Sequence, residues 1–239
     1  MVKCWKCAKN TINLRPVNKL GKLIVIEGLD GAGKSTQLSL LVERLNREGK
    51  GCKEVSFPNY ESKACEPVKM YLNGEFGKDV NDVNAYAASV FYAVDRYASF
   101  KSQWGEYYNN GGTIICGRYV TSNAIHQCSK LDENLWDSFS SWLYDFEYNK
   151  MGLPKPDAVI FLSMPEEVSD KLLLERYSGD ESKKDIHELD REYQKKCRKS
   201  AFFAAEKDGW LTINCVKNNE LRSIQDIGDE IYDLVTDII

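Results

Sequence analysis

The hydrophobic residues of this chain fall into short runs that alternate with longer amphipathic segments. Leu23–Ile26 is a run of four apolar residues, which is typical of a strand buried on both faces of a parallel sheet. A glycine-rich stretch follows it. Gln37–Glu48 then has apolar residues at helical spacing and ends before Gly49. The pattern predicts a strand, a tight turn and a helix at the start of a folded domain.

Further strand signals recur along the chain, separated by segments long enough for helices. The predicted strands are Lys53–Phe57, Thr113–Cys116, Ala158–Met164 and Leu211–Cys215. The helical windows are Val83–Tyr108, Asp132–Met151, Glu166–Tyr177, Asp185–Asp208 and Leu221–Ile239. Alternating strands and helices favour an α/β fold, so we expect a three-layer α/β/α sandwich around a parallel sheet of about five strands.

The ends of this pattern suggest one domain with an extension. Residues 1–19 are polar and basic without a clear period, so we interpret them as an N-terminal extension to a domain at 20–239. Within the domain, polar Ser178–Lys184 interrupts two helical windows, and we expect a lid at about residues 178–190.

Cys4 and Cys7 of the extension form one C-x-x-C pair. A structural zinc site needs four ligands, so we favour a reduced pair over zinc completed by a second subunit.

The composition limits the partners of the chain. Its 239 residues include 36 acidic and 32 basic side chains, giving a net charge of −4, which argues against a general binder of nucleic acid or anionic membranes. Its apolar stretches are far shorter than the ~18 residues of a membrane span, and the N-terminus lacks the apolar core of a signal peptide. Eight cysteines at irregular spacing then indicate a reduced, cytoplasmic protein.

One motif carries specific chemistry. Residues 28–35 read G-L-D-G-A-G-K-S and match G-x-x-x-x-G-K-[ST] between a predicted strand and a predicted helix. Its glycines let backbone N–H groups converge on phosphates, Lys34 can reach the outer phosphates, and the Ser35 hydroxyl can ligate Mg²⁺. The sequence therefore predicts a site for ATP and Mg²⁺ at Gly28, Asp30, Gly31, Ala32, Gly33, Lys34, Ser35 and Thr36.

The motif G-x-x-x-x-G-K-[ST] is known as a P-loop and occurs in several classes of enzyme. Other features of the sequence indicate which class this chain belongs to. A GTPase also needs an N-K-x-D sequence, which is absent here. The compact size and the lid favour a nucleotide kinase, whose lid excludes water from the transfer step. The loop has no second cation, so we expect Lys183 and Lys184 of the lid to supply it, although such lysines can also be a solvated charge run. Arg176, just before the lid, would lie over the adenine or the phosphates.

Several motifs in order resemble the thymidylate kinase family of P-loop nucleoside monophosphate kinases. Besides the P-loop, Phe57-Pro58-Asn59-Tyr60 resembles F-P-x-Y, and Tyr92-Ala93-Val94-Asp95-Arg96 resembles F-x-x-[DN]-R. Residues 118–127 resemble D-R-Y-x-x-S-x-x-A-[YF]-Q without its Asp, and residues 185–193 resemble the helix after the lid. The resemblance covers about residues 20–239. It implies a P-loop kinase fold, phosphoryl transfer from Mg·ATP to dTMP, and a homodimer. The dimer contact could use apolar positions of Val83–Phe100, which could equally belong to the core.

The resemblance also implies roles for residues at the base of the nucleotide. Arg96 would meet the thymine carbonyl edge, and Asn123 would hydrogen-bond the pyrimidine. Tyr92 would stack on the base, and Phe57 would line the same pocket. His126 stands where the family has Tyr or Phe, and it could stack, form a hydrogen bond or simply pack.

A second set of implied residues belongs to the phosphates. Arg118 would hold the monophosphate, because its guanidinium fork suits a phosphate group. Asp30 and Tyr60 would lie by the sugar and phosphate, while Asp185 and Glu188 would close the site from the lid. The expected catalytic residues are Lys34, Arg118, Lys183, Lys184 and Asp30.

Departures from the family pattern keep other functions open. Gly117 replaces the Asp before Arg118, where a carboxylate would lie near the metal and the arginine. Asp30 or Asp95 could compensate for it. Ser163 and Ala201 replace a common Asp and Tyr. The alternatives are a kinase for another nucleotide or a nucleoside, and a nucleotide-binding module that has lost efficient transfer.

Overall fold

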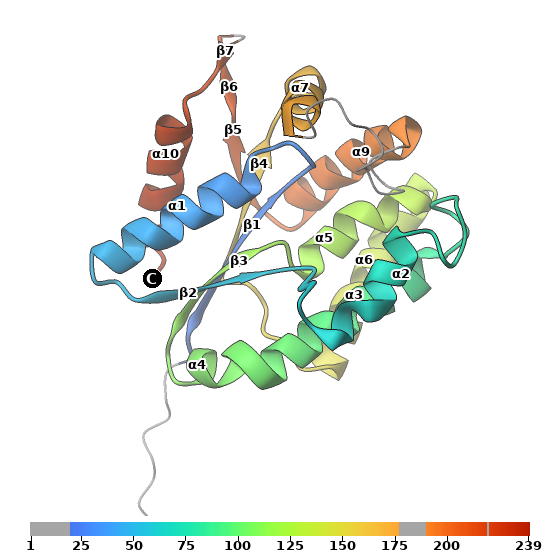
Figure 1. Ribbon diagram of the computed structural model, residues 1–239, viewed down its shortest axis with the longest axis horizontal. Coiled ribbons are helices and arrows are strands. Elements are labelled where there is room, and N and C mark those ends of the chain that lie inside the picture. The colour runs from blue at the N-terminus through green and yellow to red at the C-terminus, as the bar shows by residue number, and fades with distance from the viewer. Residues whose placement is uncertain (1–19, 177–189, 219) are drawn as a thin grey trace, which may run out of the picture.

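The computed structural model describes residues 20–176, 190–218 and 220–239, and its centre is a parallel sheet (Figure 1). The strands stand in the order β2-β3-β1-β4-β5, and all four pairings are parallel. They are β1 (Lys22–Gly28), β2 (Cys52–Ser56), β3 (Thr113–Gly117), β4 (Ala158–Ser163) and β5 (Leu211–Asn214). The five predicted strands are confirmed. A short antiparallel pair, β6 (Val216–Lys217) and β7 (Glu220–Leu221), was not predicted.

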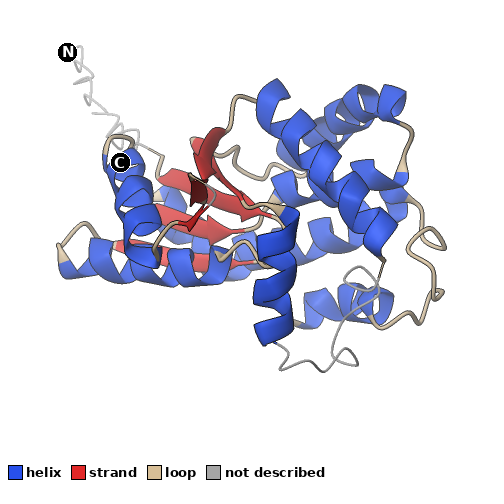
Figure 2. Cartoon of the chain, turned by 90° about the horizontal axis from the view of Figure 1, so that it is seen from above, coloured by secondary structure: helices blue, strands red, loops and turns tan. Residues whose placement is uncertain are grey.

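Helices cover both faces of the sheet, so the three-layer prediction is confirmed (Figure 2). Alternate residues of β1 face opposite sides: Ile24 and Ile26 belong to one core cluster, and Leu23 and Val25 to the other. The first cluster is covered by α1 (Lys34–Arg47), α7 (Glu166–Arg176) and α10 (Ile224–Thr236). The second is covered by α4 (Gly105–Asn109), α5 (Val120–His126), α6 (Trp136–Tyr144) and α9 (Arg191–Lys207).

Two predicted helical windows are interrupted by π-helical turns. The Val83–Tyr108 window contains α3 (Ala85–Ser99), a π-helical turn at Phe100–Trp104 and α4. The Asp132–Met151 window contains a 3₁₀ turn, α6 and a second π-helical turn at Asp145–Lys150. A π turn inserts one extra residue per turn and changes which side chains face the core. The apolar spacing alone did not indicate this change.

Two helices beside the sheet have no counterpart among the sequence predictions. All seven residues of α5 are buried and four of them are polar, so the helix has no solvent-exposed face and no amphipathic period. Helix α2 (Glu66–Leu72) is also seven residues long and begins with a proline in its first turn. Segments this short carry too few residues for a periodic signal.

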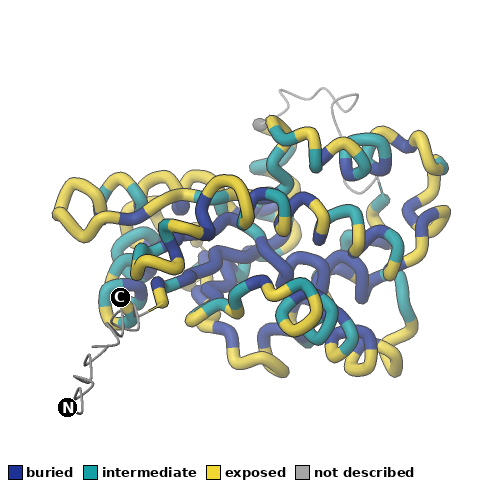
Figure 3. Tube along the Cα trace, turned by 90° about the horizontal axis from the view of Figure 1, so that it is seen from below, coloured by how far each residue is buried: buried dark blue, intermediate teal, exposed yellow. Residues whose placement is uncertain are grey.

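Buried residues concentrate on the strands and on α5, whereas the outer helices expose one side (Figure 3). The six described cysteines are free and buried, as expected for a reduced protein. Among the described helices, none has the length and apolar character needed to cross a bilayer.

Candidate active site

A cavity of about 1020 Å³ opens where the carboxyl ends of the strands meet the helices. Parallel strands place the loops that follow them at one edge of a sheet, which is where α/β proteins bind ligands. The cavity lies between the P-loop, the ends of β2 and β3, and α2, α3, α5 and α7. The predicted residues that line it are Asp30, Gly31, Ala32, Gly33, Lys34, Ser35, Thr36, Phe57, Tyr60, Tyr92, Arg96, Arg118, Asn123 and His126.

The P-loop runs from the end of β1 to the start of α1. Gly28 ends the strand, and Gly33 caps the helix with φ 79°. Gly31 has φ 77°, and a Cβ atom there would lie 2.5 Å from the backbone oxygen of Ser169 in α7, so the loop needs glycine at this point. The N–H groups of the first turn of α1 point out of the start of the helix, which makes this end of the cavity suited to phosphate.

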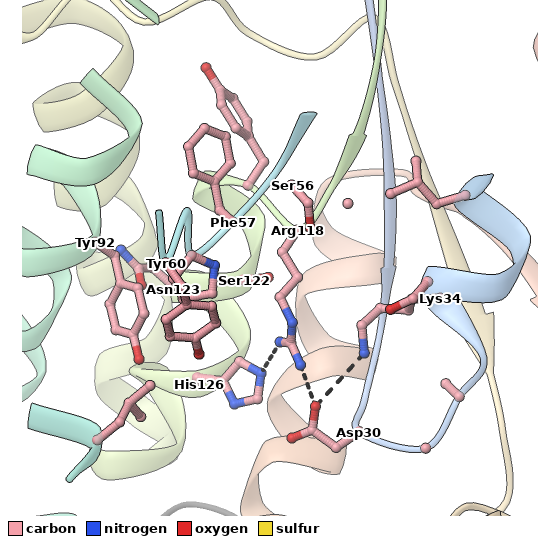
Figure 4. A pocket seen from close by; sticks show the side chains of 18 of the residues that line it. Asp30, Lys34, Ser56, Phe57, Tyr60, Tyr92, Arg118, Ser122, Asn123 and His126 are labelled. Carbon is pink, nitrogen blue, oxygen red and sulfur yellow. Dashed lines mark hydrogen bonds and ion pairs between the residues drawn. The ribbon is translucent and has the colours of Figure 1, made fainter. Parts of the chain in front are cut away.

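The Asp30 carboxylate interacts with both Lys34 and Arg118 on the P-loop side of the cavity. Lys34 Nζ donates a hydrogen bond to the Leu29 carbonyl at 2.7 Å and lies 3.9 Å from Asp30 Oδ1. The same Oδ1 accepts a hydrogen bond from Arg118 Nη2. Figure 4 shows Arg118 reaching between Lys34 and His126 toward Asp30.

Arg118 has an unusual backbone conformation and two side-chain partners. Its φ of 60° lies in the left-handed region, which is uncommon for a residue other than glycine. Arg118 Nη1 lies 2.9 Å from His126 Nε2. Because arginine only donates, this contact requires Nε2 of His126 to be an unprotonated acceptor. Burial acts to lower the pKa of Arg118, but the carboxylates of Asp30 and Glu27 outweigh it and raise the pKa above its ordinary value.

Gly117 faces α1 and the end of β2 rather than the guanidinium group of Arg118. A Cβ atom at Gly117 would lie 2.8 Å from Leu38 Cδ2 and 3.2 Å from Ser56 Oγ. Of the two carboxylates considered as replacements for the family Asp, Asp30 contacts Arg118. Asp95 instead accepts a hydrogen bond from the Asn59 backbone N–H at 2.8 Å.

The opposite end of the cavity is formed by α3 and α5. Tyr92 and Arg96 come from α3, and Asn123 and His126 come from α5. Phe57 is 3% exposed and packs on Tyr119 with ring centroids 6.2 Å apart. This end therefore combines aromatic rings, the Asn123 amide and Arg96, whereas the P-loop end carries Lys34 and Arg118.

Arg96 is buried although it lines the cavity. Only 1% of the residue is exposed, and its Nε and Nη2 atoms donate to the Glu147 carboxylate at 2.7 and 2.6 Å. Burial acts to lower the pKa of Arg96, and the adjacent Glu147 carboxylate raises it. Arg96 therefore carries its charge in a fixed orientation.

A sequence profile of the family described as thymidylate kinase matches residues 26–227. The chain belongs to the thymidylate kinase family. It is 32% identical over 176 residues to thymidylate kinase from Mycobacterium tuberculosis, covering 73% of this chain and 81% of that protein. It is 29% identical over 223 residues to thymidylate kinase from Plasmodium falciparum, covering 92% of each. Its fold is similar to that of thymidylate kinase from Candida albicans, with a TM-score of 0.67, 23% identity, and coverage of 91% of this chain and 92% of that one.

Sequence reasoning missed several residues of this thymidylate kinase cavity. Gln127 is fully buried at its wall, and within the described residues neither atom of its amide group has a hydrogen-bond partner. It is the last residue of the quoted 118–127 motif, which was the available signal. Lys69 and Ser56 also line the cavity and had no motif to mark them.

Glu27 is a second missed residue. Its carboxylate is fully buried and accepts hydrogen bonds from Thr121 Oγ1 at 2.6 Å and Ser122 Oγ at 2.8 Å. It also accepts one from the Tyr119 backbone N–H at 3.3 Å. Glu27 therefore ties β1 to the start of α5 and fixes the segment that follows Arg118.

Some predicted residues of the family site lie outside the described part of the chain. These are Lys183, Lys184, Asp185 and Glu188 of the expected lid. Cys4 and Cys7 of the expected N-terminal extension also lie outside the described part. Arg176 ends α7, and its side chain also lies outside the described part.

Proposed function

We propose that this protein transfers the γ-phosphoryl group of ATP to dTMP and so makes dTDP for dTTP synthesis. The observation that carries this proposal is the position of Arg118. It lies in one cavity between the P-loop, with Lys34 and Asp30, and an aromatic and amide-rich end formed by α3 and α5. Such a cavity can hold two nucleotides with their phosphates meeting at Arg118.

The acceptor phosphate is the nucleophile in this reaction. A phosphate monoester is already anionic at neutral pH, so no general base is required. Lys34 and Arg118 stabilise the negative charge that develops on the transferring group. Asp30, which contacts both cations, holds them in position before the substrates bind.

The residues at the P-loop suit a magnesium nucleotide. Gly33 leaves open space where a side chain would stand, and Ser35 is exposed in the first turn of α1. Within the described residues there is no cluster of three or more His, Cys, Asp or Glu side chains for a metal ion. The ion would therefore arrive with the ATP phosphates and be held through the Ser35 hydroxyl, where it neutralises phosphate charge.

The lid residues complete the proposed site. The described P-loop contributes one lysine, so Lys183 and Lys184 are the proposed source of a further cation and Arg176 the proposed contact to ATP. At the other end, Gln127 offers both a donor and an acceptor to the base of dTMP.

A coupled assay of the full-length protein with ATP and a panel of acceptors tests this function. We expect phosphorylation of dTMP, with dUMP, dCMP, dGMP and thymidine as comparisons. Preference for another acceptor would point to the rival kinase that Gly117 and His126 suggest. Binding of ATP without transfer to any acceptor would point to a nucleotide-binding module.

A further inference from the structure

Glu147 holds two side chains of the acceptor end at once. It is fully buried on the π-helical turn Asp145–Lys150. It pairs with Arg96 through two hydrogen bonds, and its Oε1 also accepts from Asn123 Nδ2 at 3.3 Å. These partners come from α3 and α5, and both line the cavity.

The carboxylate dictates which atoms its partners offer to a ligand. A carboxylate only accepts hydrogen bonds, so Asn123 must turn its NH₂ group toward Glu147. The same Nδ2 donates to the Ser89 carbonyl at 3.3 Å. Both amide hydrogens are then used inside the protein, and the carbonyl oxygen of Asn123 is the atom left for a ligand.

Arg96 offers hydrogen-bond donors to a ligand, whereas Asn123 offers an acceptor. Its bonds to Glu147 and to the Tyr119 carbonyl at 3.3 Å use three of its five N–H groups within the described residues. The remaining N–H groups can only donate. Of this pair of residues, Arg96 therefore presents donors and Asn123 an acceptor, and the Glu147 carboxylate fixes which residue does which.

Stability alone does not account for this arrangement. Burying two charges carries a desolvation penalty that often equals or exceeds their attraction, and apolar residues of the same size commonly fill such a place at no loss of stability. A fixed donor and acceptor, in contrast, discriminate strongly between ligands, because a mismatched base leaves buried polar groups unpaired.

We propose that Glu147 is a positioning residue that sets the hydrogen-bond polarity of the acceptor site. Through Arg96 and Asn123 it selects a base that has a ring N–H beside a carbonyl, the pattern of thymine and uracil. It rejects the reversed pattern of cytosine, which has a ring acceptor beside an amino group. This inference rests on the proposed function, because it assigns the selectivity of that same site.

The first test is Glu147→Gln in the full-length protein. Glutamine keeps the shape but offers an NH₂ group, so Asn123 is free to turn and Arg96 loses one acceptor. We expect KM for dTMP to rise at least tenfold while kcat falls less than threefold. The ratio of kcat/KM for dTMP to that for dCMP should fall at least tenfold. KM for ATP should stay within twofold, and Glu106→Gln on the exposed side of α4 is the matched control.

A second variant covers the case in which Glu147→Gln unfolds because Arg96 keeps a buried charge. Arg96→Met combined with Glu147→Met removes both charges and preserves the volume. Thermal unfolding should show a folded protein, and its preference for dTMP over dCMP should be lost. A folded variant of either kind with the wild-type preference would overturn the inference. If the wild type itself prefers a different monophosphate, the proposed function fails, and the role of Glu147 is judged by whether its variants change that preference.

Discussion

The segment around Arg118 shows how single residues shape the catalytic end of the cavity. A left-handed conformation costs a non-glycine residue about 1–3 kcal/mol, so surrounding bonds must hold it. The Arg118 backbone N–H donates to the Ile26 carbonyl at 3.2 Å, and Cys116 Sγ donates to the Arg118 carbonyl at 3.0 Å. Asp30 and His126 then fix the guanidinium. The orientation that a carboxylate at position 117 was expected to provide comes from these two side chains.

Gly117 itself packs closely against α1. We expect Gly117→Ala to lower the free energy of unfolding by about 1–3 kcal/mol, because the new Cβ atom would stand 2.8 Å from Leu38 Cδ2. Leu38→Ala opens that space at a cost of about 2–4 kcal/mol of its own. The double variant should lose less unfolding free energy than the two single variants together, by at least about 0.5 kcal/mol. Urea denaturation of the four proteins measures this coupling, and strictly additive costs would show that the two side chains do not compete for space.

Lys130 makes the stability of the protein depend on pH. Its ammonium group donates to Tyr71 Oη at 2.6 Å and to the Val83 carbonyl at 2.9 Å, and burial lowers its pKa from 10.5 to about 8. Between pH 8 and 10.5 the unfolded chain therefore binds more protons at this lysine than the folded one does. The contribution of Lys130 to stability is lowest below pH 8 and rises through that window.

Lys130→Met removes this dependence. We expect the free energy of unfolding of the wild type, relative to the variant, to rise by about 1–3 kcal/mol from pH 7.5 to pH 10. Urea denaturation at several pH values gives both curves, and all other titrating groups are common to the two proteins. Parallel curves would mean that Lys130 titrates alike in the folded and unfolded states.

The P-loop residues could be assigned from sequence because their chemistry lies in contiguous residues. Asp30, Lys34 and Ser35 stand in one octapeptide next to a strand and a helix. Glu147 has no such signal. It lies 51 residues from Arg96 in the chain, and only the fold brings them into contact. The contact between His126 and Arg118 could not be inferred either, because it depends on the left-handed backbone at Arg118.

At the level of elements, burial decided which segments could be predicted. The strands of a parallel sheet are covered on both faces, so they appear as apolar runs, and all five were found. Helix α5 is equally buried, but its seven residues mix polar and apolar side chains without an exposed face and give no helical period. The π-helical turns were not predicted because a π-helical turn has the same kinds of residues as the α-helix around it. One of them still has a clear consequence, since it carries Glu147.

At the level of the whole molecule, the parallel sheet explains how a chain with a net charge of −4 can bind two anionic nucleotides. All its strands end at one edge, so cations that are distant in sequence meet there. Lys34, Lys69, Arg96 and Arg118 come from four different elements or their loops and line one cavity. The overall charge excluded a broad anionic surface as a partner, and it left a local cationic site possible.

Helix α3 connects this cavity to the outer surface. Its inner face carries Arg96 and the buried Ala88 and Ala93. Its outer face exposes apolar side chains at helical spacing: Tyr86 (45%), Val90 (37%), Val94 (43%) and Tyr97 (38%). The predicted contact helix therefore packs on the core on one side and has a partly exposed apolar stripe on the other. Within the stripe, Tyr86 also packs on Phe139 and Trp142 of α6. We propose that a second copy of the chain covers this stripe and forms the homodimer.

Val90→Asp combined with Val94→Asp tests the dimer. Both side chains are exposed in one copy, so the fold should tolerate the change, while two buried pairs of carboxylates would disrupt the contact between copies. We expect a dimer for the wild type and a monomer for the variant in sedimentation equilibrium, with similar circular dichroism. Leu40→Asp on α1, where the leucine is 42% exposed, is the matched control and should remain dimeric. Because α3 also carries Tyr92 and Arg96, KM for dTMP should rise in the monomer. If the double variant stays dimeric, the interface lies on another face of the protein.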